Sequence, residues 1–563
     1  MRREVSVVNK KVCSFPILFA LLALLIGTCA VVFPASAQAA PTSTGSITVS
    51  GTVARSYDAY QIFSANVVDG DSDAKIAADL AWASDAARNA VLPVLHSAGM
   101  PNSQTTAQEA AEWLNNDSHL TSALSAQLAR SLQSSGAKSV ALNAGTTAEL
   151  PCGYWLIVAD DDAISQNEAG TAPIMALVGG SAVTVKPKAA MPKVQKHVLE
   201  DSTAAWQKAA DATVADDLYW RLSATVPAGL TAYDTYTVRF VDTMSAGLDP
   251  SKVAASMRVY VAAGADGGFD AVSAGKDGRA GTDPAKGWTD ITAQCATKVA
   301  ADGKTFTVRT GDLIAALGGA DAFTAGARVV AVYNAPLNGA CNHGIAKGNP
   351  NEVYLRYPRS PLADQSGDAG FTRTPSDDAC AYTWDLALTK RGSDGDKPLS
   401  GAVLSIADDR GRTLSADGTW DAEGKATVTT GEDGRVTVSG VDSGKLEVRE
   451  LKAPKGYTAF EGTRSVTVKA EGLDVEQVAA AKPKLTITAE SPLRADSADG
   501  STGSLEASLI NTPTGTPPSI TTGGFMPSTG DMAMYAAAAA AVAGAALIVV
   551  ALLVKRGGGG HKE

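Results

Sequence analysis

The chain has 563 residues, a formal net charge of −11 and a pI near 5.1. This acidity argues against nucleic acid as a partner, because no basic stripe is present to neutralise phosphates. The five histidines are scattered and no HExxH, GxSxG or Walker-type motif occurs, so the sequence supports neither a conventional enzyme nor a bound metal or cofactor. Without the two terminal segments described next, about 490 residues remain, a length that predicts about three domains.

The N-terminus has the order of residues that is typical of a secretory signal peptide. Basic residues precede an apolar run from about Phe15 to Phe33, and the small residues Ala35 to Ala39 follow. The sequence predicts a signal peptide over 1–39, and the alternative is an N-terminal membrane anchor.

A second apolar segment, Tyr535–Val554, lies near the C-terminus and is followed by Lys555 and Arg556. As a helix, its 20 or so residues would span a bilayer core of roughly 30 Å. Because basic residues stay on the cytoplasmic side, the chain before this segment is expected outside the cell.

A short motif stands directly before this segment: Met526-Pro527-Ser528-Thr529-Gly530. Followed by a span and a basic tail, it resembles the LPxTG sorting signal of Gram-positive surface proteins, with Met526 in place of leucine. The resemblance implies that a sortase cysteine attacks the Thr529 carbonyl and releases the chain from Gly530 onward. The protein would then be joined to the cell wall at the cell surface, and the C-terminal helix would hold it in the membrane only temporarily. The alternative is a chance Pro-Ser-Thr-Gly turn.

The first predicted domain covers residues 40–188 and mixes strands with helices. Thr106–Glu109 has the pattern of a capping box, and leucines at four-residue spacing from Leu120 to Leu132 predict a second helix. The helices are expected to decorate a β-sandwich, with the leucines in its core. Three strand-like runs flank them: Ile47–Val49, Tyr154–Val158 and Ala182–Val185.

The second predicted domain, 189–365, consists of short alternating strands and turns, which favour a sandwich. In the run 234–241, Tyr236, Val238 and Phe240 share one face, and the period of two places Asp242 on that apolar face. Burial raises the pKa of a carboxyl group, so such a residue is expected to be paired or chemically employed.

In the third predicted domain, 378–513, three apolar strand faces each end in one polar residue: Lys390, Glu450 and Asn511. A lysine kept from water loses its proton more easily, and a neutral glutamic acid can polarise an amide. At near-attack distance, the amine would displace ammonia and leave an isopeptide bond. The alternative is a solvent-facing Lys390 and Glu450, with Asn511 in a turn before Pro513.

Two motifs of this domain carry a family resemblance. Glu450–Tyr457, which reads ELKAPKGY, resembles the glutamate box of Cna B-type domains in Gram-positive pilins, and Pro398–Ala402 is similar to their strand entry. The resemblance implies a Lys390–Asn511 bond formed with Glu450 as catalyst. It also implies a mainly β chain of three tandem immunoglobulin-like, Cna B-type sandwiches, the first with helical insertions, followed by the C-terminal transmembrane helix.

The second domain is similar to the middle domain of such pilins. Lys196 stands where the bond-forming lysine is expected, and Asp242–Leu248 fits the family's aspartate segment, which implies a catalytic role for Asp242. Arg359 occupies the position at which the resemblance implies an asparagine. We therefore predict no Lys196 isopeptide bond, and a buried ion pair of Asp242 with Lys196 or Arg359 instead.

The exit of the first domain reads Lys186-Pro187-Lys188 and resembles the pilin motif whose lysine accepts the threonine of the next subunit. The resemblance implies that Lys188 is the polymerisation residue. The alternative is a basic interdomain linker made stiff by proline. A second linker is predicted at 514–525, and the sorting signal, span and tail at 526–563.

Four cysteines remain after signal-peptide removal: Cys152, Cys295, Cys341 and Cys380. They allow three full pairings, and the preferred expectation is a disulfide of Cys341 with Cys295 or Cys380.

The sequence therefore predicts a cell-wall-anchored pilus subunit, most simply of the shaft, that works with sortase, neighbouring subunits and peptidoglycan. It is not expected to be an enzyme beyond a single-turnover autocatalytic step. The competing hypothesis is an unpolymerised or tip adhesin that binds a host glycan or matrix protein through the helical region 75–136.

Overall fold

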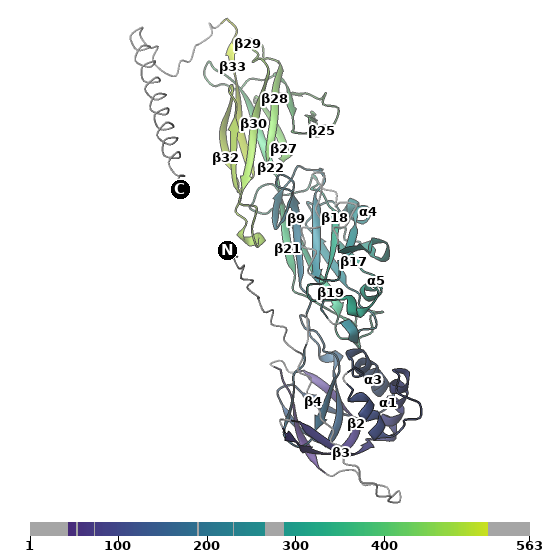
Figure 1. Cartoon of the computed structure of the whole chain (residues 1–563). Coiled ribbons are helices and arrows are strands. Elements are labelled where there is room, and N and C mark those ends of the chain that lie inside the picture. The colour runs from purple at the N-terminus through teal and green to yellow at the C-terminus, as the bar shows by residue number, and fades with distance from the viewer. Residues whose placement is uncertain are drawn as a thin grey trace, which may run out of the picture.

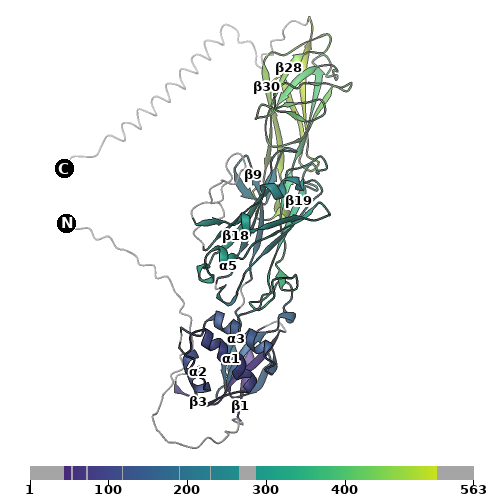
Figure 2. The same ribbon diagram turned by 90° about the vertical axis from the view of Figure 1, so that its right-hand side faces the viewer.

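The computed structural model describes residues 43–515, except 52–54, 72–73, 117, 189–190, 229 and 265–286. The predicted signal peptide, sorting motif and C-terminal span lie outside the described residues. Within the described ranges, no helix is long and apolar enough to cross a membrane. Figure 1 shows three packed units that follow one another in chain order along an elongated molecule, and the view in Figure 2 agrees.

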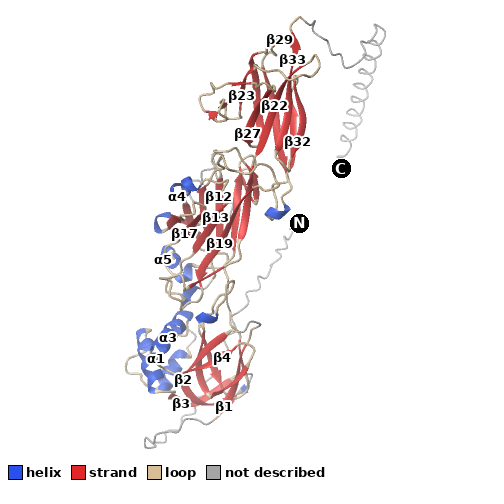
Figure 3. Cartoon of the chain, turned by 180° about the vertical axis from the view of Figure 1, so that it is seen from behind, coloured by secondary structure: helices blue, strands red, loops and turns tan. Residues whose placement is uncertain are grey.

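The first unit combines two sheets with three helices, which lie on one side of it (Figure 3). Its elements are β1 (Thr44–Val49), β2 (Ser56–Asp69), β3 (Lys75–Trp82), α1 (Asp85–Ser97), α2 (Ala107–Leu114), α3 (Ser122–Ser134), β4 (Ser139–Asn143), β5 (Thr147–Pro151), β6 (Gly153–Ala159), β7 (Ile174–Val178) and β8 (Val183–Val185). One sheet has the order β5-β1-β8, and the other has the order β3-β2-β6-β7 with β4 paired to β2.

Strand β2 separates two cores in this unit. Tyr57 and Ala59 face the β1 sheet, whereas Tyr60 and Ile62 pack against the helices. The predicted capping box is confirmed: the Thr106 hydroxyl accepts from the Glu109 amide, and the Glu109 carboxylate accepts from the Thr106 amide. The predicted leucine helix is α3, whose leucines 124, 128 and 132 are buried in the helical core.

The second unit is a sandwich of two sheets around the largest apolar cluster of the described residues. Its elements are β9 (Val194–Glu200), β10 (Ala205–Gln207), β11 (Ala209–Asp211), β12 (Tyr219–Thr225), β13 (Arg239–Met244), α4 (Val253–Ser256), β14 (Arg258–Ala262), β15 (Trp288–Asp290), β16 (Ala296–Val299), β17 (Thr305–Arg309), α5 (Leu313–Ala316), β18 (Arg328–Asn334), β19 (Asn349–Pro358), β20 (Phe371–Arg373) and β21 (Asp377–Tyr382). The sheet orders are β10-β9-β12-β18-β14-β15 and β11-β21-β19-β13-β17-β16, with β20 on β19.

Two details differ from the sequence-based expectation. The strand expected at 234–241 begins only at Arg239, although Tyr236, Val238 and Phe240 are all buried as predicted. Strand β21 pairs with β19 and β11, so residues 377–382 complete the second sandwich, whereas the third domain was expected to begin at 378. Backbone pairing across the sequence, which local patterns do not encode, decides where this strand belongs.

The third unit is a sandwich in which the first and last strands are neighbours. Its strands are β22 (Trp384–Gly392), β23 (Val403–Ala407), β24 (Thr413–Leu414), β25 (Trp420–Asp421), β26 (Val428–Thr429), β27 (Arg435–Val441), β28 (Gly444–Lys452), β29 (Tyr457–Thr458), β30 (Thr463–Glu471), β31 (Lys484–Ala489), β32 (Leu493–Asp499) and β33 (Ser504–Pro513). One sheet has the order β27-β22-β33-β29 with β32 on β33, and the other has the order β25-β24-β23-β28-β30-β31 with β26 on β23. The chain is thus mainly β, as expected.

Candidate isopeptide sites and the acceptor lysine

The third unit brings its three predicted polar residues together. Lys390 lies on β22 and Asn511 on β33, which run parallel, while Glu450 lies on β28 of the facing sheet. Their side chains point inward because each continues the alternation of an apolar strand face, such as Leu386 and Leu388 before Lys390. The relative exposures are 0% for Lys390, 6% for Glu450 and 2% for Asn511, so all three are shielded from solvent.

The distances in this trio suit an amine, an amide and a catalytic carboxyl group. The Lys390 Nζ lies 3.5 Å from Glu450 Oε1 and donates to the Leu509 carbonyl at 3.2 Å. The Asn511 Nδ2 donates to both Glu450 oxygens at 2.9 and 3.0 Å. Glu450 is therefore placed between the nucleophile and the amide that the nucleophile would attack.

Burial shifts the Lys390 amine toward its neutral form. Burial lowers the pKa of Lys390 to about 8, although the Glu450 carboxylate acts in the opposite direction. With this pKa, about a tenth of the amine is unprotonated at pH 7, far more than for an ordinary lysine, and only the unprotonated form is nucleophilic.

The amide of Asn511 has an unused acceptor. Its Oδ1 is buried without a hydrogen-bond partner, whereas its Nδ2 faces Glu450. The oxygen and nitrogen of a side-chain amide are nearly the same size. A 180° rotation of the Asn511 amide group would therefore fit the same space and bring Oδ1 next to Glu450. A protonated Glu450 would then donate to this oxygen and make the amide carbon a better electrophile.

The second unit contains a comparable buried network. Lys196 on β9 and Asp242 on β13 form an ion pair, and both side chains are fully buried. The Lys196 Nζ also donates to the Tyr333 hydroxyl at 2.9 Å, and this hydroxyl lies 3.1 Å from Asp242 Oδ2. The predicted Lys196–Asp242 ion pair is thus present.

Arg359 does not take part in this network. It donates to the Asp161 carbonyl at 2.9 Å and lies 3.8 Å from the Asp162 carboxylate, both in the first unit. The alternative ion pair of Asp242 with Arg359 is therefore wrong, because the end of β19 carries Arg359 toward the neighbouring unit rather than into the sandwich.

The amide side chain that belongs to this network is Asn351, which the sequence reading did not select. It is fully buried on β19, and its Nδ2 donates to the Tyr333 hydroxyl at 2.8 Å. Its Oδ1 has no partner, as for Asn511. The alternation of β19 could have identified Asn351 as an inward residue, because Asn351 precedes the inward Val353 and Leu355 with a period of two.

The pKa of Lys196 in the second network is shifted in the same direction as that of Lys390. Burial lowers the pKa of Lys196 to about 8, against the effect of Asp242. Burial also raises the pKa of Asp242, which Lys196 partly opposes. Both shifts favour the neutral amine and the neutral acid, the pair of forms that amide-bond formation needs.

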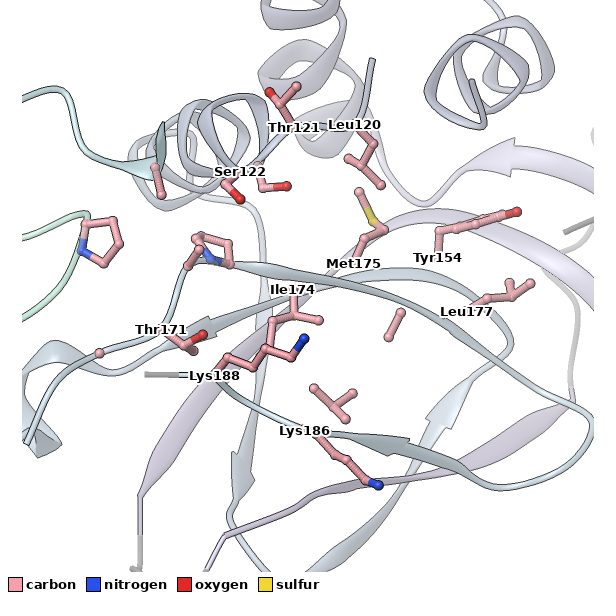
Figure 4. Close-up of a pocket in the computed structure, with 18 of the residues that line it drawn as sticks. Leu120, Thr121, Ser122, Tyr154, Thr171, Ile174, Met175, Leu177, Lys186 and Lys188 are labelled. Carbon is pink, nitrogen blue, oxygen red and sulfur yellow. The ribbon is translucent and has the colours of Figure 1, made fainter. Parts of the chain in front are cut away.

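The predicted acceptor lysine lies at a pocket between the first and second units. The pocket has a volume of about 880 Å³, and both Lys186 and Lys188 line it. Lys188 is exposed, and Figure 4 shows its side chain beside Thr171 and Ile174. An exposed amine can be reached by a large acyl-enzyme, as the predicted role of Lys188 requires.

The expected disulfide of Cys341 with Cys295 or Cys380 is not formed: all four described cysteines are free. The Cys295 thiol donates to the Ile291 carbonyl at 3.3 Å, and Cys380 is buried in the core of the third unit. Cys341 instead lies 3.5 Å from a ring nitrogen of His343. The strands and loops that carry these residues point the thiols toward different neighbours.

Comparisons with known proteins find a similarity in the third unit. Residues 385–482 match the family model described as the SpaA prealbumin-like fold domain. Over 143 residues the chain is 30% identical to the trypsin-resistant surface T6 protein of Streptococcus pyogenes serotype M6, a match that covers 24% of this chain and 24% of that relative.

Two of the solved structures that the chain matches are pilins. The T6 backbone pilin of serotype M6 Streptococcus pyogenes is 17% identical with a TM-score of 0.45, and the match covers 84% of this chain and 98% of that one. The full-length major pilin SpaD from Corynebacterium diphtheriae is 15% identical with a TM-score of 0.40, again over 84% and 98%. The family match itself extends over most of the third unit, which is similar to SpaA prealbumin-like fold domains.

Proposed function

We propose that this protein is a subunit of the shaft of a sortase-assembled pilus on a Gram-positive cell surface. The observation that carries the proposal is the buried trio of Lys390, Glu450 and Asn511 in a domain that matches the SpaA family model. The T6 relative, a streptococcal surface protein, is in keeping with an exported protein. Sortase, neighbouring subunits and peptidoglycan are the proposed partners.

The trio would form one covalent bond without a cofactor. The Lys390 Nζ attacks the Asn511 side-chain carbonyl carbon, the new C–N bond forms, and ammonia leaves with the Asn511 nitrogen. Glu450 donates a proton to the carbonyl oxygen, moves one amine proton to the leaving nitrogen, and takes back the oxygen proton when the amide carbonyl re-forms. The product ties β22 to β33, the strands at the two ends of the domain.

We further propose a second bond, between Lys196 and Asn351, with Asp242 as catalyst. The sequence-based prediction was that Lys196 forms no isopeptide bond, because Arg359 occupies the position at which an asparagine was expected. The buried Asn351 supports the second bond, since Asn351 shares the Tyr333 hydroxyl with Lys196 and Asp242.

Intact-mass analysis of the full chain tests both bonds. We expect a mass lower than the sequence mass by two ammonias, one for each bond. Asn351→Ala has no acyl group for Lys196 to attack, so this variant should show the loss of one ammonia only. A wild-type mass that lacks only one ammonia would contradict the second bond if the Asn351 variant shows the same loss, and the first bond if that variant shows none. A wild-type mass that lacks no ammonia would contradict both.

Polymerisation is proposed to join Thr529 of one subunit to Lys188 of the next. In wall extracts, we expect ladders of high molecular weight that disappear in Lys188→Ala. Lys186→Ala is the matched control, because Lys186 lines the same pocket and should leave the ladder intact. A single anchored band in the wild type would favour the alternative, an unpolymerised adhesin for a host glycan or matrix protein.

A further inference from the structure

A cysteine, a histidine and an aspartate meet where the second and third units join. The Cys341 Sγ lies 3.5 Å from the His343 Nε2, and the His343 Nδ1 lies 2.7 Å from the Asp385 Oδ2. Cys341 and His343 belong to the loop between β18 and β19, while Asp385 belongs to β22 of the third unit. This set is separate from both isopeptide networks.

The hydrogen bonds that Asp385 accepts hold its carboxylate in place beside His343. Its other oxygen, Oδ1, accepts from the Ser439 hydroxyl at 2.5 Å and from the Gly440 amide at 3.1 Å. The carboxylate is thereby held 2.7 Å from the His343 Nδ1, a charge contact that favours the proton on this nitrogen although the ring N–H does not form a hydrogen bond with it. With that proton on Nδ1, the Nε2 lone pair faces the Cys341 thiol, which is the arrangement of a nucleophile with its base and an orienting acid.

The loop is fixed against the third unit by backbone contacts. The Gly344 amide donates to the Thr383 carbonyl at 3.1 Å, and the Ile345 amide donates to the Gly500 carbonyl at 3.1 Å. Gly344 has a φ of +74°, and a Cβ there would lie 2.5 Å from the Gly503 amide nitrogen. Only glycine allows this close approach, so the junction itself positions His343 beside Asp385.

The thiol needs a base to react. Burial and the nearby Asp385 carboxylate raise the pKa of Cys341, so the thiol carries its proton at neutral pH. Cys341 and His343 are nevertheless partly exposed, and the His343 side chain keeps 26% of its surface accessible. A small reagent can reach the pair.

We propose that Cys341 is a thiol-modification site that takes low-molecular-weight disulfides, with His343 as its base and Asp385 as a positioning residue. The His343 Nε2 takes the thiol proton, and the Cys341 sulfur attacks one sulfur of the reagent. The reagent's S–S bond breaks, a new Cys341 disulfide forms, and the leaving thiolate recovers the proton from His343. The proposal does not depend on the pilus function.

The test is the rate of adduct formation by glutathione disulfide on each cysteine of the full chain, followed by peptide mass mapping. Cys295 is the internal control, because it is also partly exposed but its thiol donates to a backbone carbonyl. We expect Cys341 to react at least about ten-fold faster than Cys295. This ratio is smaller than the rate increase that a general base usually contributes. Buried Cys152 and Cys380 should stay unmodified, which reports that the protein is folded.

Four variants, two at His343 and two at Asp385, test whether His343 acts as a base or Cys341 reacts only because it is exposed. His343→Gln should lower the Cys341 rate about ten-fold toward that of Cys295, because the side chain keeps a similar bulk but loses the base. His343→Gly should be equally slow and should recover when free imidazole is added. Asp385→Asn should also slow the reaction, and Asp385→Glu should restore part of the rate. An unchanged Cys341 rate in His343→Gln, or no recovery of His343→Gly with imidazole, would overturn the proposal.

Discussion

At the scale of single residues, this chain places ionisable groups where water cannot reach them. Lys196 and Lys390 are both fully buried, and each has one acidic partner and a nearby amide whose Oδ1 has no hydrogen bond. Buried charges and orphaned acceptors are costly, so two repeats of one costly pattern indicate that the groups are used. Amide-bond formation would convert the lysine amine into a neutral amide and release the asparagine nitrogen as ammonia. No charged amine would then remain buried.

A first prediction concerns Glu450. The variant Glu450→Gln keeps the shape of the side chain but cannot carry a proton to the Asn511 oxygen and on to the leaving nitrogen. We expect its intact mass to exceed the wild-type product by one ammonia, apart from the small mass change of the substitution itself. Glu447→Gln is the control on the same strand, because Glu447 is exposed and paired with Lys445. Bond formation at the normal rate in Glu450→Gln would show that Glu450 is not the catalyst.

At the scale of elements, the important feature is the parallel pairing of β22 with β33. Their register sets Lys390 opposite Leu509, with Asn511 opposite Gly392, so the two reactive side chains lie on neighbouring strands. A covalent bond between the strands would connect the two ends of the domain. Force that pulls on the termini of this domain would then cross a bond that cannot unzip.

A second prediction follows for the stability of the third unit. Asn511→Ala cannot form the bond, which closes a loop of about 120 residues and is worth roughly 4–5 kcal/mol on the chain-entropy model for cross-links. We expect the unfolding free energy of this domain to fall by about that amount in a denaturant titration. Glu450→Gln should show a similar loss, since it too lacks the bond. Wild-type stability in Asn511→Ala would mean that no bond forms in the parent protein.

At the scale of the whole molecule, the units are joined by polar contacts as well as by the chain. The Arg412 guanidinium of the third unit donates to both oxygens of Asp216 at 2.5 and 2.7 Å. The buried Asp211 accepts from the Trp384 indole at 2.6 Å and from the Ser443 hydroxyl at 2.5 Å. Bidentate and buried hydrogen bonds of this kind fix the orientation of one sandwich on the next.

A third prediction concerns pH and this junction. Burial, together with the nearby Asp211, raises the pKa of Glu200 from 4.5 to about 7. A raised carboxyl pKa means that the folded protein binds more protons, so this stabilisation is full below pH 4.5 and is lost as the pH rises through 7. The loss is about 3 kcal/mol between the two ends of this window.

The variant Glu200→Gln should remove this part of the pH dependence. We expect it to be more stable than the wild type at pH values above the Glu200 pKa, and similar to the wild type in acid, in thermal melts of the full chain. Glu447→Gln, on the exposed face of β28, should leave the pH profile unchanged. A Glu200→Gln profile that matches the wild type across the window would show that Glu200 titrates normally.

The sequence alone determined the features that depend on local periodicity. Alternation in three strands placed Lys390, Glu450 and Asn511 inward, and the same period of two placed Asp242 among apolar residues. The capping box at Thr106 and the leucine stripe of α3 were likewise readable, because an i to i+3 or i+4 relation is fixed by the helix itself.

Only the tertiary structure decided which distant residues share a site. Asn351 rather than Arg359 joins Lys196 and Asp242, because the registers of β13 and β19 set Asn351 beside Met244 while the end of β19 leads Arg359 to the first unit. The packing of two units likewise brings Asp385 to His343 and Cys341, residues that no local pattern connects. Strand alternation determines which side of a sheet a residue faces, but strand register and domain packing determine which distant residues it contacts.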